Sequence, residues 1–123
     1  MARIKRRASP VEYKLCNQTV TVYHKDNEIY TRRVYTHAFL DFKKSQNIDK
    51  TGSAEANGFL LVIPCPEQSV YVGDKVLLGI GPEVSTREGW ASLIPAKVPG
   101  LVVVKYVDTK YWNGKMVHVE AGG

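Results

Sequence analysis

The chain has 123 residues, of which 44% are hydrophobic and 24% are charged, and this composition excludes wholesale disorder and two independent hydrophobic cores. Its two cysteines stand alone, which excludes a disulfide scaffold, and no apolar run has the roughly 20 residues of a membrane span. The formal net charge of +5 is concentrated in the first residues, so it does not indicate a broad nucleic-acid-binding surface.

A basic arm opens the chain, because Arg3, Lys5, Arg6 and Arg7 all precede the first acidic residue, Glu12. The other 13 basic residues are nearly balanced by 12 acidic residues. Such an arm favours a local contact that orders on binding, and a solvated, frayed terminus is the alternative. No apolar segment of a signal peptide follows it. We expect a protein made in the cytoplasm, with an arm over residues 1–16 and one domain over residues 17–123.

A long hairpin is predicted next. Val20 and Val22 alternate with polar residues over Gln18–His24, the period-2 pattern of a half-buried strand. The polar cluster at 25–27 interrupts this pattern, and β-branched and aromatic residues resume over Glu28–Phe42. On this second strand we expect one face in the core, formed by Val34, Thr36, Ala38, Leu40 and Phe42.

A polar loop from Lys43 to Asn57 separates this hairpin from the rest of the chain, and Ile48 is its only large apolar residue. Connections in compact domains usually have about 4 to 6 residues, and a longer structureless one tends to be functional or disordered. A flexible surface loop without a role is the alternative. As candidate interaction residues the loop offers Lys43, Lys44, Asn47, Ile48 and Lys50, just as the arm offers its four basic residues.

The remaining segments are short. The sequence predicts a buried strand at Phe59–Ile63, a strand at Lys75–Ile80, and a helix to about Ile94 that begins at the capping box Ser85-Thr86-Arg87-Glu88. A last hairpin joins strands at 101–112 and 115–120 through Asn113-Gly114. Six or seven strands without βαβ alternation predict a mainly β fold, a small antiparallel β-barrel with one short helix, the long polar loop and the extended basic arm.

Residues for catalysis or for cofactor and metal binding are not grouped in the sequence. His24, His37 and His118 lie on separate predicted strands, and neither cysteine stands in a short metal-binding spacing. We therefore expect no enzyme, no cofactor and no metal site. The alternative is an enzyme with an unrecognised site that depends on Cys65 or a histidine.

Four aromatic residues allow a different interpretation. Trp90, Trp112, Tyr106 and Tyr111 could stack on single-stranded bases if they shared a face with basic residues. Core or interface anchoring is the more common role of such residues. The rival class is therefore a small β-barrel nucleic-acid-binding protein, which would bind free nucleic acid in a salt-sensitive way.

An ordered series of segments resembles the small minor capsid or head-closure (stopper) proteins of tailed bacteriophages with long non-contractile tails. The resemblance runs over roughly residues 17–123 and depends on the order and spacing of short motifs. These are Thr19-Val-Thr-Val-Tyr-His, the tyrosine-rich second strand, the polar loop, Gly58-Phe-Leu-Leu-Val-Ile-Pro64, Gly73-Asp-Lys-Val-Leu-Leu-Gly79, Val102-Val-Val-Lys-Tyr-Val-Asp-Thr-Lys110 and Val117-His-Val-Glu-Ala-Gly-Gly123.

The resemblance implies a virion structural protein of the phage neck. Such a subunit would form a homo-oligomeric ring of six or twelve copies below the portal, retain packaged DNA and dock the tail. Its partners would be the portal or adaptor ring and tail-completion or tail-tube proteins, with no membrane contact. Lys43, Lys44 and Lys50 could contact the phosphates of packaged DNA non-specifically. Stopper, adaptor and tail-completion positions stay open.

Overall fold

The computed structural model of the protein describes residues 13–43 and 58–123, with the side chain of Lys43 outside the description. Strands account for more than half of the described residues, so the predicted mainly β fold is confirmed. In chain order these residues form β1 (Gln18–Asp26), β2 (Ile29–Lys43), β3 (Gly58–Pro64), β4 (Lys75–Leu78), α1 (Arg87–Ala91), β5 (Leu101–Val103), β6 (Tyr106–Trp112) and β7 (Lys115–Gly122).

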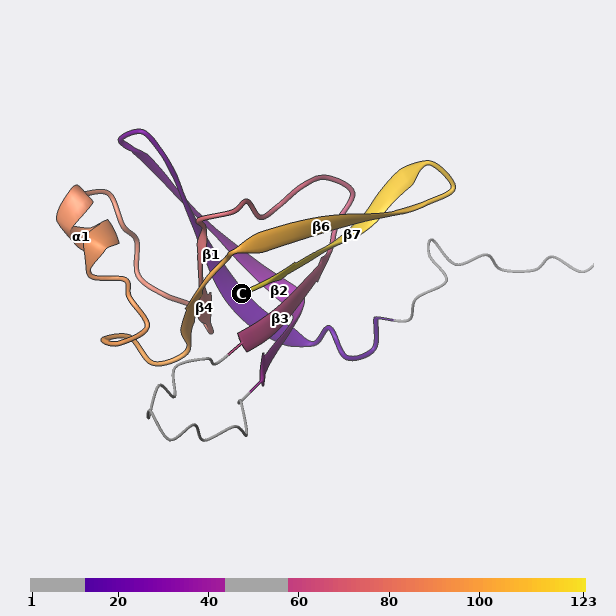
Figure 1. Cartoon of the computed structure of the whole chain (residues 1–123), viewed down its shortest axis with the longest axis horizontal. Helices are drawn as coiled ribbons and strands as arrows, with labels where there is room; N and C mark the ends of the chain where they lie inside the picture. Colours follow the sequence, from indigo (N-terminus) through magenta and orange to yellow (C-terminus); the bar gives the residue numbers. More distant parts are fainter. Residues whose placement is uncertain (1–12, 44–57) are drawn as a thin grey trace, which may run out of the picture.

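The strands form one antiparallel sheet in the order β5-β4-β1-β2-β3-β7-β6, which curls into a half-barrel (Figure 1). The two edge strands, β5 and β6, are joined by only Val104 and Lys105, so the curl brings the two edges together here. The Val104 nitrogen donates to the Asp74 oxygen at 2.9 Å, and the Lys105 nitrogen donates to the Gly122 oxygen at 2.8 Å. The single strand predicted over 101–112 is therefore wrong, because the chain crosses there from one sheet edge to the other.

The long strand β2 pairs in both halves of the sheet, and the face that it turns to the core changes partway along. Its first part pairs with β1, and its end, from Phe39, pairs with β3. Gln18 lies opposite Ala38, whereas Val20 lies opposite Tyr35, so β2 contains one extra residue, a β-bulge. Tyr35 and Ala38 therefore both pack on the core side. The prediction of one apolar face along the whole strand is wrong before the bulge, because one extra residue exchanges the two faces. It is also wrong at Phe42 after the bulge, which is 41% exposed.

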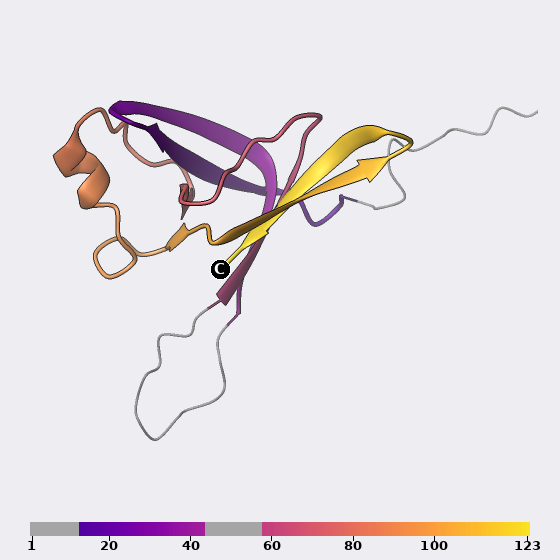
Figure 2. The ribbon, with the colours of Figure 1, turned by 45° about the horizontal axis from the view of Figure 1, so that its top comes forward.

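The inside of the curl is filled by apolar side chains. Val70 belongs to no strand, yet it is completely buried among them, so segment 65–74 covers the inside of the sheet between β3 and β4 (Figure 2). This core contains Val20, Val22, Ala38, Leu40, Phe59, Leu61, Ile63, Val70, Val76, Val104, Val119 and Ala121.

Residues 79–100 make an excursion that covers the opposite face of β1 and β4. Tyr23 and Leu77 point to this face and form a second cluster with Leu93 and Leu101. Polar contacts hold the excursion in place: the Tyr23 hydroxyl donates to the Pro82 oxygen at 2.6 Å. The buried Lys75 donates from Nζ to the Trp90 oxygen at 2.7 Å and lies 4.6 Å from the centroid of the Trp90 ring, and burial lowers its pKa. The β1–β4 half of the sheet is thus covered on both faces.

The helix is shorter than predicted. It spans five residues, and its N-cap is Thr86, whose Oγ1 accepts from the Gly89 nitrogen at 2.9 Å. The predicted cap, Ser85, stands one residue too early, because two adjacent hydroxyl residues offer alternative caps and Thr86 has the extended backbone of a cap. By contrast, the predicted turn of the last hairpin is confirmed, since Asn113 and Gly114 have φ angles of 55° and 76°.

Candidate functional site

A pocket of about 220 Å³ lies between the β1–β2 hairpin and segment 65–74. From the hairpin come Val22 and His24 of β1, with their cross-strand partners Arg33 and Thr31 of β2. Alternation along β1 explains why His24 points into the pocket, because Val20, Val22 and His24 lie on the same face of the strand, which is turned to the core. The opposite side of the pocket is formed by Glu67, Gln68, Ser69 and Tyr71.

The wall of the pocket is fixed by a pair of ionisable residues. Asp74 is only 2% exposed and precedes β4, and its Oδ1 lies 2.5 Å from Nδ1 of His24. Its Oδ2 accepts from the Tyr71 nitrogen at 2.9 Å. Burial raises the pKa of the Asp74 carboxyl, and the hydrogen bonds from His24 and the Tyr71 backbone partly offset this rise. Because Asp74 engages Nδ1, Nε2 is the imidazole nitrogen that lies away from this contact.

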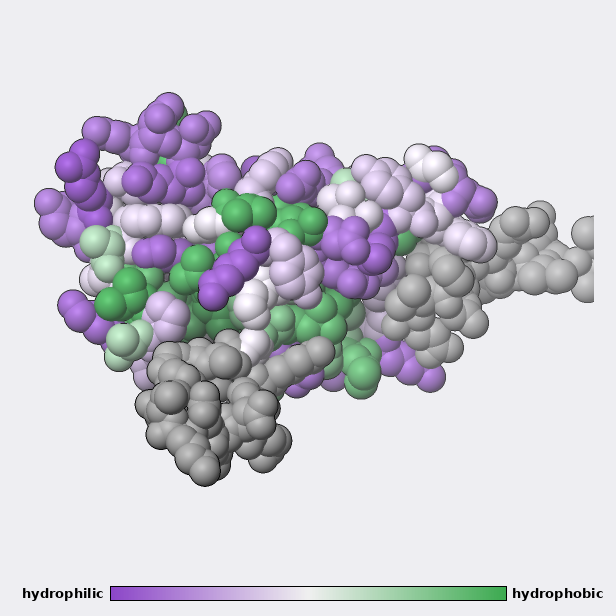
Figure 3. All heavy atoms as spheres, viewed as in Figure 1, coloured by the Kyte–Doolittle hydropathy of each residue, from purple (hydrophilic) through white to green (hydrophobic). Residues whose placement is uncertain are grey.

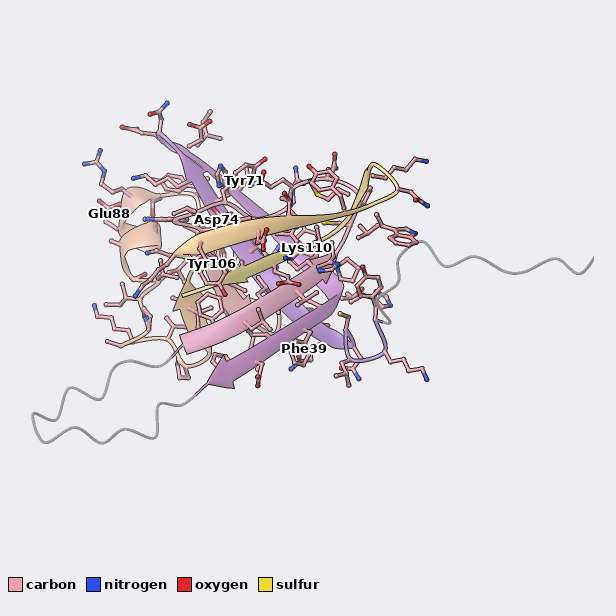
Figure 4. The ribbon with its side chains drawn as sticks, turned by 45° about the vertical axis from the view of Figure 1, so that its right-hand side comes forward. Phe39, Tyr71, Asp74, Glu88, Tyr106 and Lys110 are labelled. Carbon is pink, nitrogen blue, oxygen red and sulfur yellow. The ribbon has the colours of Figure 1, made fainter. Side chains whose placement is uncertain are left out.

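An aromatic ring and a cation border the same pocket. The Tyr71 ring is tilted against His24 with its centroid 5.0 Å away, and Tyr71 is 45% exposed (Figure 4). Arg33 is exposed, and Glu67 near it is exposed as well. The pocket can therefore hold an aromatic or polar group between a ring, a guanidinium and a carboxylate, which are groups that recognition sites use.

The three histidines lie in three separate environments. His24 pairs with Asp74, and His37 is exposed beside Thr36. His118 is buried, with Nδ1 at 2.8 Å from the Tyr13 hydroxyl and Nε2 at 3.0 Å from Glu120. The thiol of Cys65 donates within its own turn, to the Glu67 oxygen at 2.9 Å and to Ser69 Oγ at 3.3 Å. The residues on which an enzymatic alternative would depend are therefore engaged in different local networks.

The four aromatic residues considered for base stacking do not form one platform. Trp90 packs in the second cluster under Lys75, on the outer face of β4. Tyr106, Tyr111 and Trp112 lie on β6 and are exposed by 51%, 61% and 40%. Of the four, only these three could stack bases together. Lys110, which lies between them in the chain, forms an ion pair with Asp108, with its Nζ 2.7 Å from Oδ2.

The candidate interaction residues predicted in the loop and the arm lie outside the described residues, apart from the backbone of Lys43 at the end of β2. These predictions therefore stay predictions. They concern Lys43, Lys44, Asn47, Ile48 and Lys50 of the loop and Arg3, Lys5, Arg6 and Arg7 of the arm.

The described part of the chain has neither a metal-binding group of side chains nor a helix that could span a membrane. Over residues 13–43 and 58–123 no three His, Cys, Asp or Glu side chains gather in a metal-binding group. Within the same ranges, no helix has the length and apolar character that crossing a bilayer requires.

The fold defines a small, mainly β half-barrel protein with a polar pocket between the β1–β2 hairpin and segment 65–74. The model of a family of unknown function, DUF6751, matches residues 15–123, and the chain belongs to this family. No curated protein and no solved structure matches the chain.

The pocket was not predicted from the sequence. One signal for it was present, because His24 follows Val20 and Val22 at the same spacing of two residues on an inward-facing strand. The other half of the pocket had no such signal. Asp74 lies fifty residues further along the chain, and only the pairing of β1 with β4 brings it to His24.

Proposed function

We propose that this chain is a structural subunit of a tailed-bacteriophage neck, a head-closure or head-to-tail connector protein that forms a ring below the portal. In this role the ring retains packaged DNA and docks the tail without catalysis. Copies of the chain contact one another, the portal or adaptor ring, and tail-completion or tail-tube proteins. The order and spacing of the sequence motifs suggest the class, and the surface of the half-barrel supports an assembly role.

The observation that carries the assembly role is the spread of exposed large apolar side chains over separate parts of the described surface. They lie before β1, at the tip of the β1–β2 hairpin, near the end of β2, beside the pocket, at and after the end of β4, and along β6. A closed ring requires each subunit to offer two different surfaces to its neighbours, and scattered apolar sites suit such contacts. The members are Leu15, Ile29, Phe42, Tyr71, Val72, Leu78, Ile80, Tyr106, Tyr111 and Trp112.

Figure 3 supports the same interpretation from one side of the molecule. Hydrophobic side chains gather in several patches across the middle of this face, over the region where β3, β4 and the C-terminus lie in Figure 1, with hydrophilic side chains between and around them. An apolar area with a polar border is the usual anatomy of a protein–protein interface.

The test is a phage that carries this gene, with the gene disrupted near its start. We expect heads that have lost their DNA, together with free tails, in electron micrographs of the lysate. Supply of the intact chain from a plasmid should restore tailed, DNA-filled particles. Normal infectious particles without the gene product would overturn the proposal. A portal gene before this gene and a tail gene after it would support it.

A nucleic-acid-binding role is the second candidate, favoured by the β6–β7 hairpin. Tyr111 and Trp112 stand there beside Lys110 and Lys115 and are exposed, as a stacking surface requires. This second role predicts that the isolated chain binds single-stranded oligonucleotides and releases them as the salt concentration is raised. The neck proposal instead predicts assembly of the chain with itself under the same conditions.

A further inference from the structure

We infer that the pocket receives the tip of the β6–β7 hairpin from a second copy of the chain, with Trp112 as the inserted side chain. This inference rests on the proposed function, since a ring joins two different surfaces of identical subunits, and it names those surfaces. A head-to-tail contact of this kind leaves one pocket and one tip unused at the ends of any open chain of copies.

The sizes of the two parts agree. The pocket has a volume of about 220 Å³. An apolar cavity of about 150 Å³ holds a benzene molecule, so this pocket has room for a larger aromatic side chain such as an indole. Trp112 is the last residue of β6 and is 40% exposed. It stands directly before the Asn113-Gly114 turn, whose positive φ angles fix the shape of the tip.

The chemistry of the pocket suits an indole ring. Arg33 can place its guanidinium over the face of an aromatic ring, a favourable cation–π arrangement. The exposed Tyr71 ring offers a second aromatic contact. Because buried Asp74 already holds His24 in position, this wall does not have to be ordered on binding, which reduces the cost of association.

Glu67 of the pocket and Lys115 of the tip carry opposite charges. Glu67 is an exposed acidic residue of the pocket. Lys115 is the cross-strand partner of Trp112 and is exposed beside it. A tip that enters the pocket with Trp112 therefore brings an ammonium group toward a carboxylate, which favours the correct orientation.

Pocket and tip belong to separate parts of one molecule. In Figure 4, Tyr71 lies above the middle of the sheet, whereas the hairpin loop that joins β6 to β7 projects beyond it. The two surfaces therefore meet between copies. Each copy can use its pocket with one neighbour and its tip with the other, so the contact can propagate and close into a ring.

Two variants, one on each surface, test the contact with the full-length chain in sedimentation velocity experiments. Trp112→Ala damages the tip, and Arg33→Glu damages the pocket at an exposed position, so neither should unfold the chain. We expect each variant alone to associate about tenfold more weakly than the unmodified chain, as for an interface hot spot. Leu15→Ala removes an exposed apolar side chain elsewhere and should associate as the unmodified chain does.

Mixing the two damaged variants gives the decisive result. The intact pocket of Trp112→Ala can bind the intact tip of Arg33→Glu, while every other combination is damaged. We therefore expect one-to-one heterodimers and no larger species. Association of either variant at the strength of the unmodified chain would overturn this contact while leaving the ring proposal standing. An unmodified chain that stays monomeric at all soluble concentrations and in particles would overturn both.

Discussion

His24 and Asp74 are fifty residues apart in the chain, yet Nδ1 of the imidazole lies 2.5 Å from Oδ1 of the carboxyl. The pair joins the end of the β1 core face to the residue that precedes β4, and it holds His24 in the wall of the pocket. A carboxyl that is 98% buried needs such partners, because an unpaired buried charge is strongly unfavourable. The architecture of the pocket therefore depends on this contact.

The variant Asp74→Asn tests the electrostatic part of the contact. Burial raises the pKa of Asp74 above 3.8, so the folded chain keeps this proton to a higher pH than the unfolded chain does. The contribution of this carboxyl to the free energy of unfolding must then fall as the pH rises from 3.8 through the raised pKa. The variant lacks this titration. We expect the stability difference, unmodified chain minus variant, to be larger at about pH 3 than at about pH 6 in urea denaturation. An equal or opposite trend would show that the carboxyl does not titrate in this way.

The variant Gly81→Ala tests how tightly the excursion at 79–100 lies on the sheet. A methyl group at this position would collide with the Tyr23 hydroxyl and come within 2.6 Å of Leu77 Cδ2. Tyr23 is 1% exposed and bonded to the Pro82 oxygen, so it cannot move aside easily. We expect a loss of about 1–3 kcal/mol in the free energy of unfolding.

A double-mutant cycle with Tyr23→Phe provides the control for this prediction. The phenylalanine variant lacks the hydroxyl that the new methyl group would meet, so Gly81→Ala should cost less in that background. Strictly additive costs would mean that the collision is relieved elsewhere, for example by movement of the loop.

Tyr13→Phe tests the attachment of the segment before β1. The Tyr13 hydroxyl bonds Nδ1 of His118, which is 4% exposed, and the two rings meet edge to face with centroids 5.5 Å apart. Removal of the hydroxyl should cost about 1 kcal/mol, because the ring contact stays and one buried hydrogen bond is lost. Amide hydrogen exchange should increase at residues 13–17 and stay unchanged in β4. Unchanged exchange at Tyr13 would contradict this role of the contact.

Replacement of residues 45–56 by a short turn tests the working role of the polar loop in the proposed neck function. Lys43 and Gly58 are paired across β2 and β3, so a hairpin connection of about two to five residues can join these strands. We expect a folded chain with nearly unchanged thermal stability, and particles that leak DNA or lack tails. Infectious particles of normal yield would remove the loop from the mechanism, whereas an unfolded chain would show a structural role.

Much of the fold could be predicted from local sequence, and the failures have physical causes. Period-2 alternation placed the first strand, and Asn113-Gly114 placed the last turn, because both signals act over a few residues. The bulge opposite Gln18 and Val20 was not predictable, since one extra residue in a long strand has no compositional mark there. The break at Val104 depends on the hydrogen bond from its nitrogen to the oxygen of Asp74, which lies thirty residues away along the chain but beside it in the fold.

The pairing of β3 with β7 has a consequence for the order in which the molecule forms. The hairpin of β1 and β2 needs only neighbouring residues, but β3 gains its second partner only when residues 115–122 are available. On the ribosome, β3 therefore remains an exposed edge while the 50 residues between Pro64 and Lys115 are still being made. Because β3 pairs with β7 late, the part of the sheet formed by β3, β7 and β6 forms slowly, and the β6–β7 tip forms after the β1–β2 hairpin. Assembly through this tip can thus begin only after residues 106–122 have been synthesised.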